Sequence, residues 1–341
     1  GVTGVQTCAL PIYTVEVVRG AIVESRHKVH AAVVDVDGRL RARIGNPDLV
    51  TFIRSAAKPF QSVPLVRDGA MDRFGITLEE LALCCGSHSG EPRHVAGVAS
   101  MLGKLGLDSE ALVCGPQPPR HEPTCRDLAE RGIEPGRLHN NCSGNHVGML
   151  ALARAHGWEL TGYNRPEHPV QGRILSEVAR WAGVPFEAIG LGVDGCGAVC
   201  FALPLHQAAF AYANLAAAAR RGERDATYVV GAMTSYPEMV GGEGRLCTEL
   251  MECTAGRIVA KSGAEGLYCV GVPGAELGVA LKIEDGASRA MYSAVVEALL
   301  QLGALSFDEA NALSSRHRPV LRNWAGDAVG ALEPAFRLTF A

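Results

Sequence analysis

A serine and a lysine three residues apart, Ser55 and Lys58 in "TFIRSAAKPFQS", have the types and spacing to do chemistry. Positions i and i+3 share a face of a helix, so the hydroxyl and the amine can meet if a helix begins near Ser55. A serine hydroxyl becomes a good nucleophile when a base removes its proton, and an uncharged lysine can be that base. A serine that only caps a helix starting around Lys58 and Pro59 gives the same pattern. The motif alone therefore leaves both interpretations open.

A second motif lies far along the chain, where "AKSGAEG" contains Lys261, Ser262 and Gly263 on an expected strand. Serine acyl enzymes of the β-lactamase and penicillin-binding type combine Ser-x-x-Lys with a later Lys-Ser/Thr-Gly on a strand. The order of the two motifs fits that pattern. Together they favour an enzyme that forms an acyl-serine intermediate.

Between these motifs, "CCGSHSGEPRH" places Ser87 and Ser89 on either side of a histidine, just before an expected helix. Such a loop can present hydroxyl and backbone N–H groups to a cleft. By itself it is equally well explained as a polar connection in which Ser89 or Gly90 caps the helix.

Two further polar islands, "HNNCSGNH" and "VDGCGAVC", contain a spacing that could chelate a metal. Cys142 and His146 are four residues apart at a helix start, and Cys196 could add a third ligand from a turn. Cysteine is common in this chain, with 11 copies. On spacing alone the sequence favours buried structural cysteines over a metal site.

The elements that must position these residues follow from the patterning. Residues 15–46 alternate apolar and polar side chains around Asp37-Gly38, which predicts antiparallel strands joined by a hairpin. Residues from 55 to about 190 are patterned as helices, with a capping box at Thr77 and Glu80 and a proline start at Glu91-Pro92. After residue 195 a strand, a long alanine-rich helix, three short strands and another helix are expected.

Strands at both ends of the chain, with helices between them, predict an α+β fold whose antiparallel sheet is built from the N- and C-terminal segments. We expect a single catalytic domain over residues 14–341. It has a sheet lobe (about 14–54 and 191–341) and a helical lobe (about 55–190). Residues 1–13 differ in texture from the rest and are expected to be a non-native leader, so they are left out of the fold.

The bulk composition excludes several classes of protein. The chain has 341 residues, a formal net charge of -4 and no basic run, which argues against nucleic acid or an anionic membrane as partner. Its most apolar stretch, residues 201–219, is interrupted by proline, histidine and amide side chains that are expensive in a bilayer. The scattered cysteines predict free thiols and a cytoplasmic location.

The chain resembles the L-asparaginase II family, the rhizobial-type asparaginases. The resemblance runs in the same order from about residue 15 to the C-terminus, through six blocks: "RSAAKPFQ", "CCGSHSGE", "NNCSGNH", "DGCGAVCFALP", "MVGGEGRLCTELM" and "AKSGAEGLYCVG". It implies a fold similar to serine β-lactamases and glutaminases, a homodimer, no organic cofactor, and hydrolysis of L-asparagine to L-aspartate and ammonia.

The resemblance also implies two serine-lysine pairs, Ser55 with Lys58 and Ser87 with Lys261. We expect Ser55 to be the nucleophile, with Ser87 relaying protons or holding substrate, although the sequence supports the reverse assignment as well. Arg54, Ser143, His146 and Asp194 neighbour the matched blocks and are candidates for binding the substrate's α-amino and α-carboxylate groups. Each could equally be a capping or ion-pair residue.

The family's zinc site is altered in this chain. Cys142 and Cys196 match its two cysteine ligands, but Asn145 stands where the family has a lysine. An amide is a poorer zinc ligand than a neutral amine. Two alternatives to an asparaginase remain. The Ser-x-x-Lys and Lys-Ser-Gly motifs alone would also suit a β-lactamase-like or peptidase-like acyl serine hydrolase, and Asn145 favours a catalytically impaired homologue that binds zinc or an amino acid.

Overall fold

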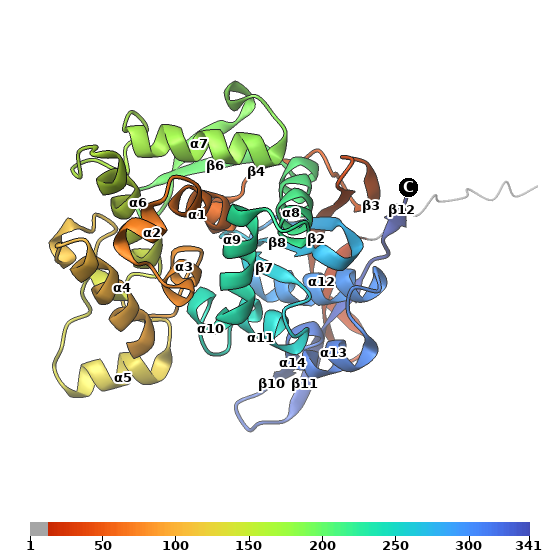
Figure 1. The fold of residues 1–341 in the computed structure, drawn as a ribbon. Coiled ribbons are helices and arrows are strands. Elements are labelled where there is room, and N and C mark those ends of the chain that lie inside the picture. Colours follow the sequence, from red (N-terminus) through yellow and green to blue (C-terminus); the bar gives the residue numbers. More distant parts are fainter. Residues whose placement is uncertain (1–12) are drawn as a thin grey trace, which may run out of the picture.

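The structure, a computed structural model, describes residues 13–341 (Figure 1). The expected leader, residues 1–13, lies outside the described residues apart from Tyr13. Within the described part, no helix is long and apolar enough to cross a membrane.

The main sheet joins the two ends of the chain, as the sequence predicts. In space its strands run β10-β11-β1-β2-β9-β8-β7, with β3 paired to both β2 and β12, and every pairing is antiparallel. The strands are β1 (Thr14–Arg19), β2 (Ile22–Asp35), β3 (Leu40–Ile44), β7 (Val259–Ser262), β8 (Leu267–Val272), β9 (Leu277–Ile283), β10 (Val320–Arg322), β11 (Ala328–Ala335) and β12 (Thr339–Phe340). The predicted α+β class with an antiparallel sheet is confirmed.

Helices cover the centre of this sheet. Strand β8 is buried along its whole length and β9 almost so, a pattern that needs cover on both faces. The cover comes from α8 (Leu205–Arg220) and α12 (Ser288–Gln301), which both pack on β8 and β9. The alanines of α8 allow a very close approach, since a Cβ added at Gly278 would lie 1.8 Å from the carbonyl oxygen of Ala209.

The predicted local signals are present. The turn after β2 contains Gly38 with φ of 78°, and Thr77 and Glu80 form the predicted capping box. Pro92 opens its helix after Glu91. The remaining α-helices are α1 (Lys58–Arg67), α2 (Ala70–Phe74), α3 (Leu78–Cys84), α4 (Pro92–Lys104), α5 (Glu122–Glu130), α6 (Ser143–His156), α7 (Pro169–Ala182), α9 (Arg224–Ser235), α10 (Pro237–Val240), α11 (Leu246–Cys253), α13 (Phe307–Ala312) and α14 (Ser314–His317).

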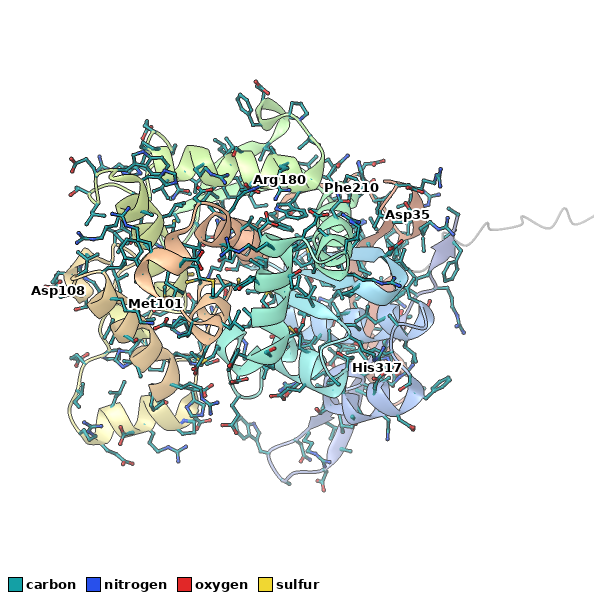
Figure 2. All side chains as sticks on the ribbon, viewed as in Figure 1. Asp35, Met101, Asp108, Arg180, Phe210 and His317 are labelled. Atoms are coloured by element: carbon teal, nitrogen blue, oxygen red, sulfur yellow. The ribbon has the colours of Figure 1, made fainter. Side chains whose placement is uncertain are left out.

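The middle of the chain is a group of packed helices. Met101 of α4 is buried in it and Asp108 lies exposed at its outer edge (Figure 2). Helix α9 packs on α1 and α3 as well as on α8, so it connects this group to the helices over the sheet. The boundaries proposed for the two lobes stay a prediction.

A second, small sheet was not predicted as a unit. It has the order β4-β6-β5, all antiparallel, from β4 (Val50–Phe52), β5 (Gly190–Val193) and β6 (Val199–Pro204). The Ile53 N–H continues this sheet by donating to the Phe201 carbonyl at 2.8 Å. The sheet thereby fixes the backbone immediately before Ser55.

Candidate functional site

Ser55 and Lys58 lie where the small sheet gives way to helix. A short 3₁₀ helix, η1 (Arg54–Ala57), separates β4 from α1, and Lys58 is the first residue of α1. Arg54 has φ of 49°, in the left-handed region that a non-glycine residue adopts only when its surroundings hold it there. Ser55 is half-buried, whereas the Lys58 side chain is buried.

Ser87 is held between three elements. It follows the end of α3, and its N–H donates to the carbonyl of Val240, the last residue of α10, at 2.8 Å. The next N–H, of His88, donates to Asn141 just before α6, at 3.1 Å. These backbone bonds fix the Ser87 hydroxyl in a buried position.

Lys261 reaches the same place from the edge of the main sheet. It lies on β7, and Gly263, the residue after that strand, is close to the small sheet, since a Cβ there would be 2.8 Å from the Ile53 carbonyl oxygen. The Lys-Ser-Gly motif is therefore on a strand, as predicted, and packs against the residues that lead to Ser55.

Both lysines contact one hydroxyl. Lys58 Nζ and Lys261 Nζ each lie 3.0 Å from Ser87 Oγ. Lys58 Nζ also donates to the Gly86 carbonyl at 2.7 Å and to Cys142 Sγ at 3.1 Å. Lys261 Nζ donates to the Ser262 carbonyl at 2.8 Å. The three side chains are almost fully buried, so this is a desolvated Lys-Ser-Lys cluster.

The arrangement differs from the two pairs that we expected. Ser87 with Lys261 is present, but Lys58 is bonded to Ser87, and no hydrogen bond joins it to Ser55 within residues 13–341. The three acceptors of Lys58 Nζ belong to residues 86, 87 and 142. The lysine side chain is long and flexible, so these acceptors decide where its amine lies, and the three-residue spacing from Ser55 does not. Ser55 remains in the wall of the same cavity, with no hydrogen bond to a lysine among the described residues.

Burial changes the acid–base behaviour of the Lys261 side chain. Desolvation, reinforced by the charge of Lys58, lowers the pKa of Lys261 to about 7. A lysine in that range is an effective base near neutral pH.

Cys142 and Cys196, the expected zinc ligands, lie together beside Lys58. Cys142 and Cys196 interact, since the hydrogen bond from Cys196 and the nearby Lys58 charge lower the pKa of Cys142 to about 5. Asn145 points its amide nitrogen at the Cys84 carbonyl, 3.4 Å away. Among the described residues no group of three His, Cys, Asp or Glu side chains could hold a metal ion. Two thiols alone do not fill the four positions of a structural zinc site, and zinc binding at Cys142 and Cys196 stays a prediction.

The expected substrate-binding residues divide into two kinds. Arg54 and Asp194 line the cavity, but they bind each other at 2.6 and 3.0 Å. Burial opposes ionisation of Asp194, yet its bonds to Arg54 keep its pKa below the usual value.

Ser143 and His146 are fully buried behind the cavity wall. Ser143 Oγ donates to the Leu138 carbonyl at 2.9 Å, and His146 Nδ1 lies 2.7 Å from the Tyr163 hydroxyl. Both side chains thus have partners inside the protein and do not line the cavity, and their predicted contact with substrate stays a prediction.

A cavity of about 380 Å³ opens onto Ser87. Besides residues already named, its wall contains side chains that the sequence did not single out: Cys114, Pro116, Gln117, Arg120, Asn140, Asn141 and Arg245. Arg245 falls inside the block "MVGGEGRLCTELM", which offered a signal, whereas nothing in the pattern around Arg120 did. Ser89, the other serine of this loop, does not line the cavity, and its hydroxyl donates to the Gly241 carbonyl at 2.9 Å.

Comparison with known proteins supports a family assignment. The family model for L-asparaginase II matches residues 15–334. No curated protein sequence matches the chain.

Three solved structures align over 81% of this chain at low similarity. They are the native form of Mglu in 4.3 M NaCl (18% identity, TM-score 0.44, 61% of that chain covered), a β-lactamase from Mycobacterium bovis (15%, 0.36, 95%) and an octameric penicillin-binding protein homologue from Pyrococcus abyssi (15%, 0.32, 73%). This chain therefore spans less than two thirds of the length of Mglu. At such TM-scores no argument is based on these likenesses.

Proposed function

We propose, because this chain belongs to the L-asparaginase II family, that it is an amidohydrolase that converts L-asparagine to L-aspartate and ammonia. The observation that carries the proposal is the buried cluster in which Lys58 and Lys261 both contact Ser87. A hydroxyl held between two amines, with a cavity large enough for an amino acid beside it, is suited to attack an amide carbon.

The hydrogen bonds support a different role for each amine. Lys58 Nζ has three acceptors, which matches the three N–H groups of an ammonium ion. Lys261 Nζ donates to Ser262 and has a lone pair left for the Ser87 proton when it is neutral. Lys261 is therefore the base, and Lys58 holds Ser87 Oγ in place and supplies positive charge.

The reaction then proceeds in two stages. Ser87 Oγ attacks the side-chain amide carbon and gives its proton to Lys261, which passes a proton to the leaving nitrogen as the C–N bond breaks. Ammonia leaves, and the aspartyl group remains as an ester on Ser87. A water molecule gives a proton to Lys261 and attacks the ester, and the serine oxygen takes that proton back as aspartate is released. Ser55 is assigned to hold the substrate or the water, in place of the nucleophilic role that its motif suggests.

Ammonia release from L-asparagine tests this proposal, with L-glutamine and a chromogenic β-lactam measured alongside. We expect the wild-type protein to act on asparagine. We expect Ser87→Ala to lower kcat by about 10³-fold or more, because the nucleophile is gone. Ser55→Ala should keep a substantial fraction of the activity, and Ser89→Ala, outside the cavity, serves as the matched control.

Three outcomes would contradict this assignment. Near-wild-type turnover by Ser87→Ala would exclude Ser87 as the nucleophile, and a complete loss in Ser55→Ala beside it would return that role to Ser55. Turnover of the β-lactam without asparagine hydrolysis would favour the acyl serine hydrolase alternative. Release of neither product would favour the impaired homologue.

We also propose a homodimer in the cytoplasm. The family resemblance implies the dimer, and the large exposed side chains of Phe307 and Trp324 are apolar surface that a second copy could cover. The ten cysteines within the described residues are all free, which supports a reducing compartment. A mass in solution of about twice 35.9 kDa is expected.

A further inference from the structure

Two arginines in the cavity wall carry positive charge without an acidic partner. Arg120 comes from the loop before α5, and Arg245 precedes α11, so distant parts of the chain bring them together. Both line the 380 Å³ cavity that contains Ser87, and both line an adjoining cavity of about 450 Å³. They therefore lie at the junction of the two cavities.

Neither guanidinium group is satisfied by the protein. Among residues 13–341 no ion pair and no side-chain hydrogen bond involves Arg120 or Arg245, although arginine stays charged under ordinary conditions. Glu265 lines the 450 Å³ cavity and has no hydrogen bond or ion pair with either arginine. Desolvation, with a smaller contribution from the charge of Arg245, lowers the pKa of Arg120. Arg120 is exposed and Arg245 is half-buried, so an anion from solution can reach both guanidinium groups and would be attracted by their combined charge.

Arg54, the arginine that the sequence pointed to, is not available in the same way. Both oxygens of Asp194 are bonded to it, so its charge is neutralised inside the protein. A substrate carboxylate that bound Arg54 would have to displace Asp194. The uncompensated positive charge on the cavity wall is that of Arg120 and Arg245.

We propose that Arg120 and Arg245 form the subsite for the substrate's α-carboxylate, and thereby select amides that carry a free carboxylate. The identity of the amide rests on the function proposed above. Guanidinium groups bind carboxylates through charge-assisted, often bidentate hydrogen bonds. With the carboxylate held where the two cavities meet, the side-chain amide extends into the 380 Å³ cavity towards Ser87. The two arginines also line the 450 Å³ cavity, so their positive charge attracts an anion that approaches through it.

Steady-state kinetics of Arg120→Gln, Arg245→Gln and the double variant test the subsite. We expect KM for L-asparagine to rise about 10-fold in each single variant and about 100-fold in the double variant, with kcat changed much less. Arg126→Gln is the matched control, because Arg126 lies on exposed α5, pairs with Glu122 and does not line either cavity. Its kinetics should equal those of the wild type.

A substrate without the carboxylate separates recognition from general damage. The α-carboxamide of L-asparagine should be a poor substrate for the wild-type protein, and the arginine variants should not make it poorer. An equal loss on both substrates, or no rise in KM for asparagine in the double variant, would overturn the subsite.

Binding of L-aspartate to Ser87→Ala, measured by calorimetry, keeps the two proposals distinct. If the protein binds aspartate only when both arginines are present but does not hydrolyse asparagine, the subsite stands and the proposed function fails. If asparagine is hydrolysed and the arginine variants bind aspartate as tightly as their parent, the function stands and the subsite fails. Neither side chain bonds to the rest of the protein, so the variants should unfold at the wild-type temperature.

Discussion

At the scale of single residues, the chemistry depends on an asymmetry between two identical side chains. Lys58 and Lys261 lie at the same distance from Ser87 Oγ, but Lys58 Nζ has three hydrogen-bond partners and Lys261 Nζ has two, one of which is Ser87 itself. One hydroxyl carries one proton, so only one amine can receive it. The proposed mechanism therefore needs one lysine in each protonation state, and the bonding pattern favours Lys261 as the neutral one.

This assignment predicts how activity depends on pH. The pKa of Lys261 is lowered to about 7 by burial and by Lys58, so its protonated fraction grows as the pH falls through 7. Because only the neutral form accepts the Ser87 proton, kcat/KM should fall towards about tenfold per pH unit below the pKa and level off above it. A profile between pH 5.5 and 9 checks this.

Two variants support the interpretation of that profile. Lys261→Met should lose activity at every pH, whereas Lys28→Met, whose side chain is exposed in β2, should keep both the rate and the shape of the profile. A flat rate from pH 6 to 8 in the wild type would show that another group is the base.

The family resemblance predicted the contact between Ser87 and Lys261, which is present, but not the bond between Lys58 and Ser87. Spacing along a helix places Cβ atoms, whereas the position of Lys58 Nζ is decided by acceptors from residues 86, 87 and 142. Arg120 escaped prediction for a related reason. Its significance depends on lying beside Arg245 and lacking an acid, and neither fact is encoded in the local pattern.

At the scale of elements, Ser87 is positioned by the close approach of α3 and α6. A Cβ at Gly144, in the first turn of α6, would lie 2.5 Å from the Leu83 carbonyl oxygen and 2.7 Å from Leu83 Cγ. Leu83 belongs to the last turn of α3, which leads directly into the loop of Ser87. The glycine in "NNCSGNH" is therefore required by helix packing.

We predict that Gly144→Ala lowers the free energy of unfolding by about 1–3 kcal/mol, because backbone cannot move aside as a flexible side chain can. It should also lower kcat by displacing the Ser87 loop. Gly172→Ala is the matched control, since a Cβ at this position in α7 meets nothing within 4 Å. That change should stabilise the protein by about 0.5–1 kcal/mol.

Urea denaturation of the two variants measures the difference. If Gly144→Ala were as stable as Gly172→Ala, the contact between α3 and α6 would not be as close as described.

Elements were predictable from sequence where their signals are local. The capping box at Thr77 and Glu80 and the turn at Gly38 are determined by neighbouring residues, so they were found. Strands β4 and β5 have three and four residues and gain their stability from β6, which lies far from β4 in the chain. Segments so short carry little periodicity of their own, so their pairing was not predicted.

At the scale of the whole molecule, the two ends of the chain complete one sheet. Strand β1 is placed between β2 and β11, so the N-terminal strand has a C-terminal neighbour along its length. Val17 is opposite Leu332, and both are buried. From β1 the sheet continues through β2, β9 and β8 to β7, the strand that carries Lys261. The stability of the site therefore depends on contacts between the two ends of the chain.

We predict that Leu332→Ala lowers the free energy of unfolding by about 2–5 kcal/mol, the usual cost of emptying a buried leucine position. Val320→Ala on the neighbouring strand β10 is the control. Its side chain is 51% exposed, so a change well below 1 kcal/mol is expected.

Hydrogen exchange tests the pairing of β1 with β11 directly. The amides of β1 should exchange faster in Leu332→Ala, although they lie more than 300 residues away in sequence. Unchanged protection of β1 would mean that the N-terminal strand is held by β2 alone, and that the C-terminal segment is not needed to complete the sheet.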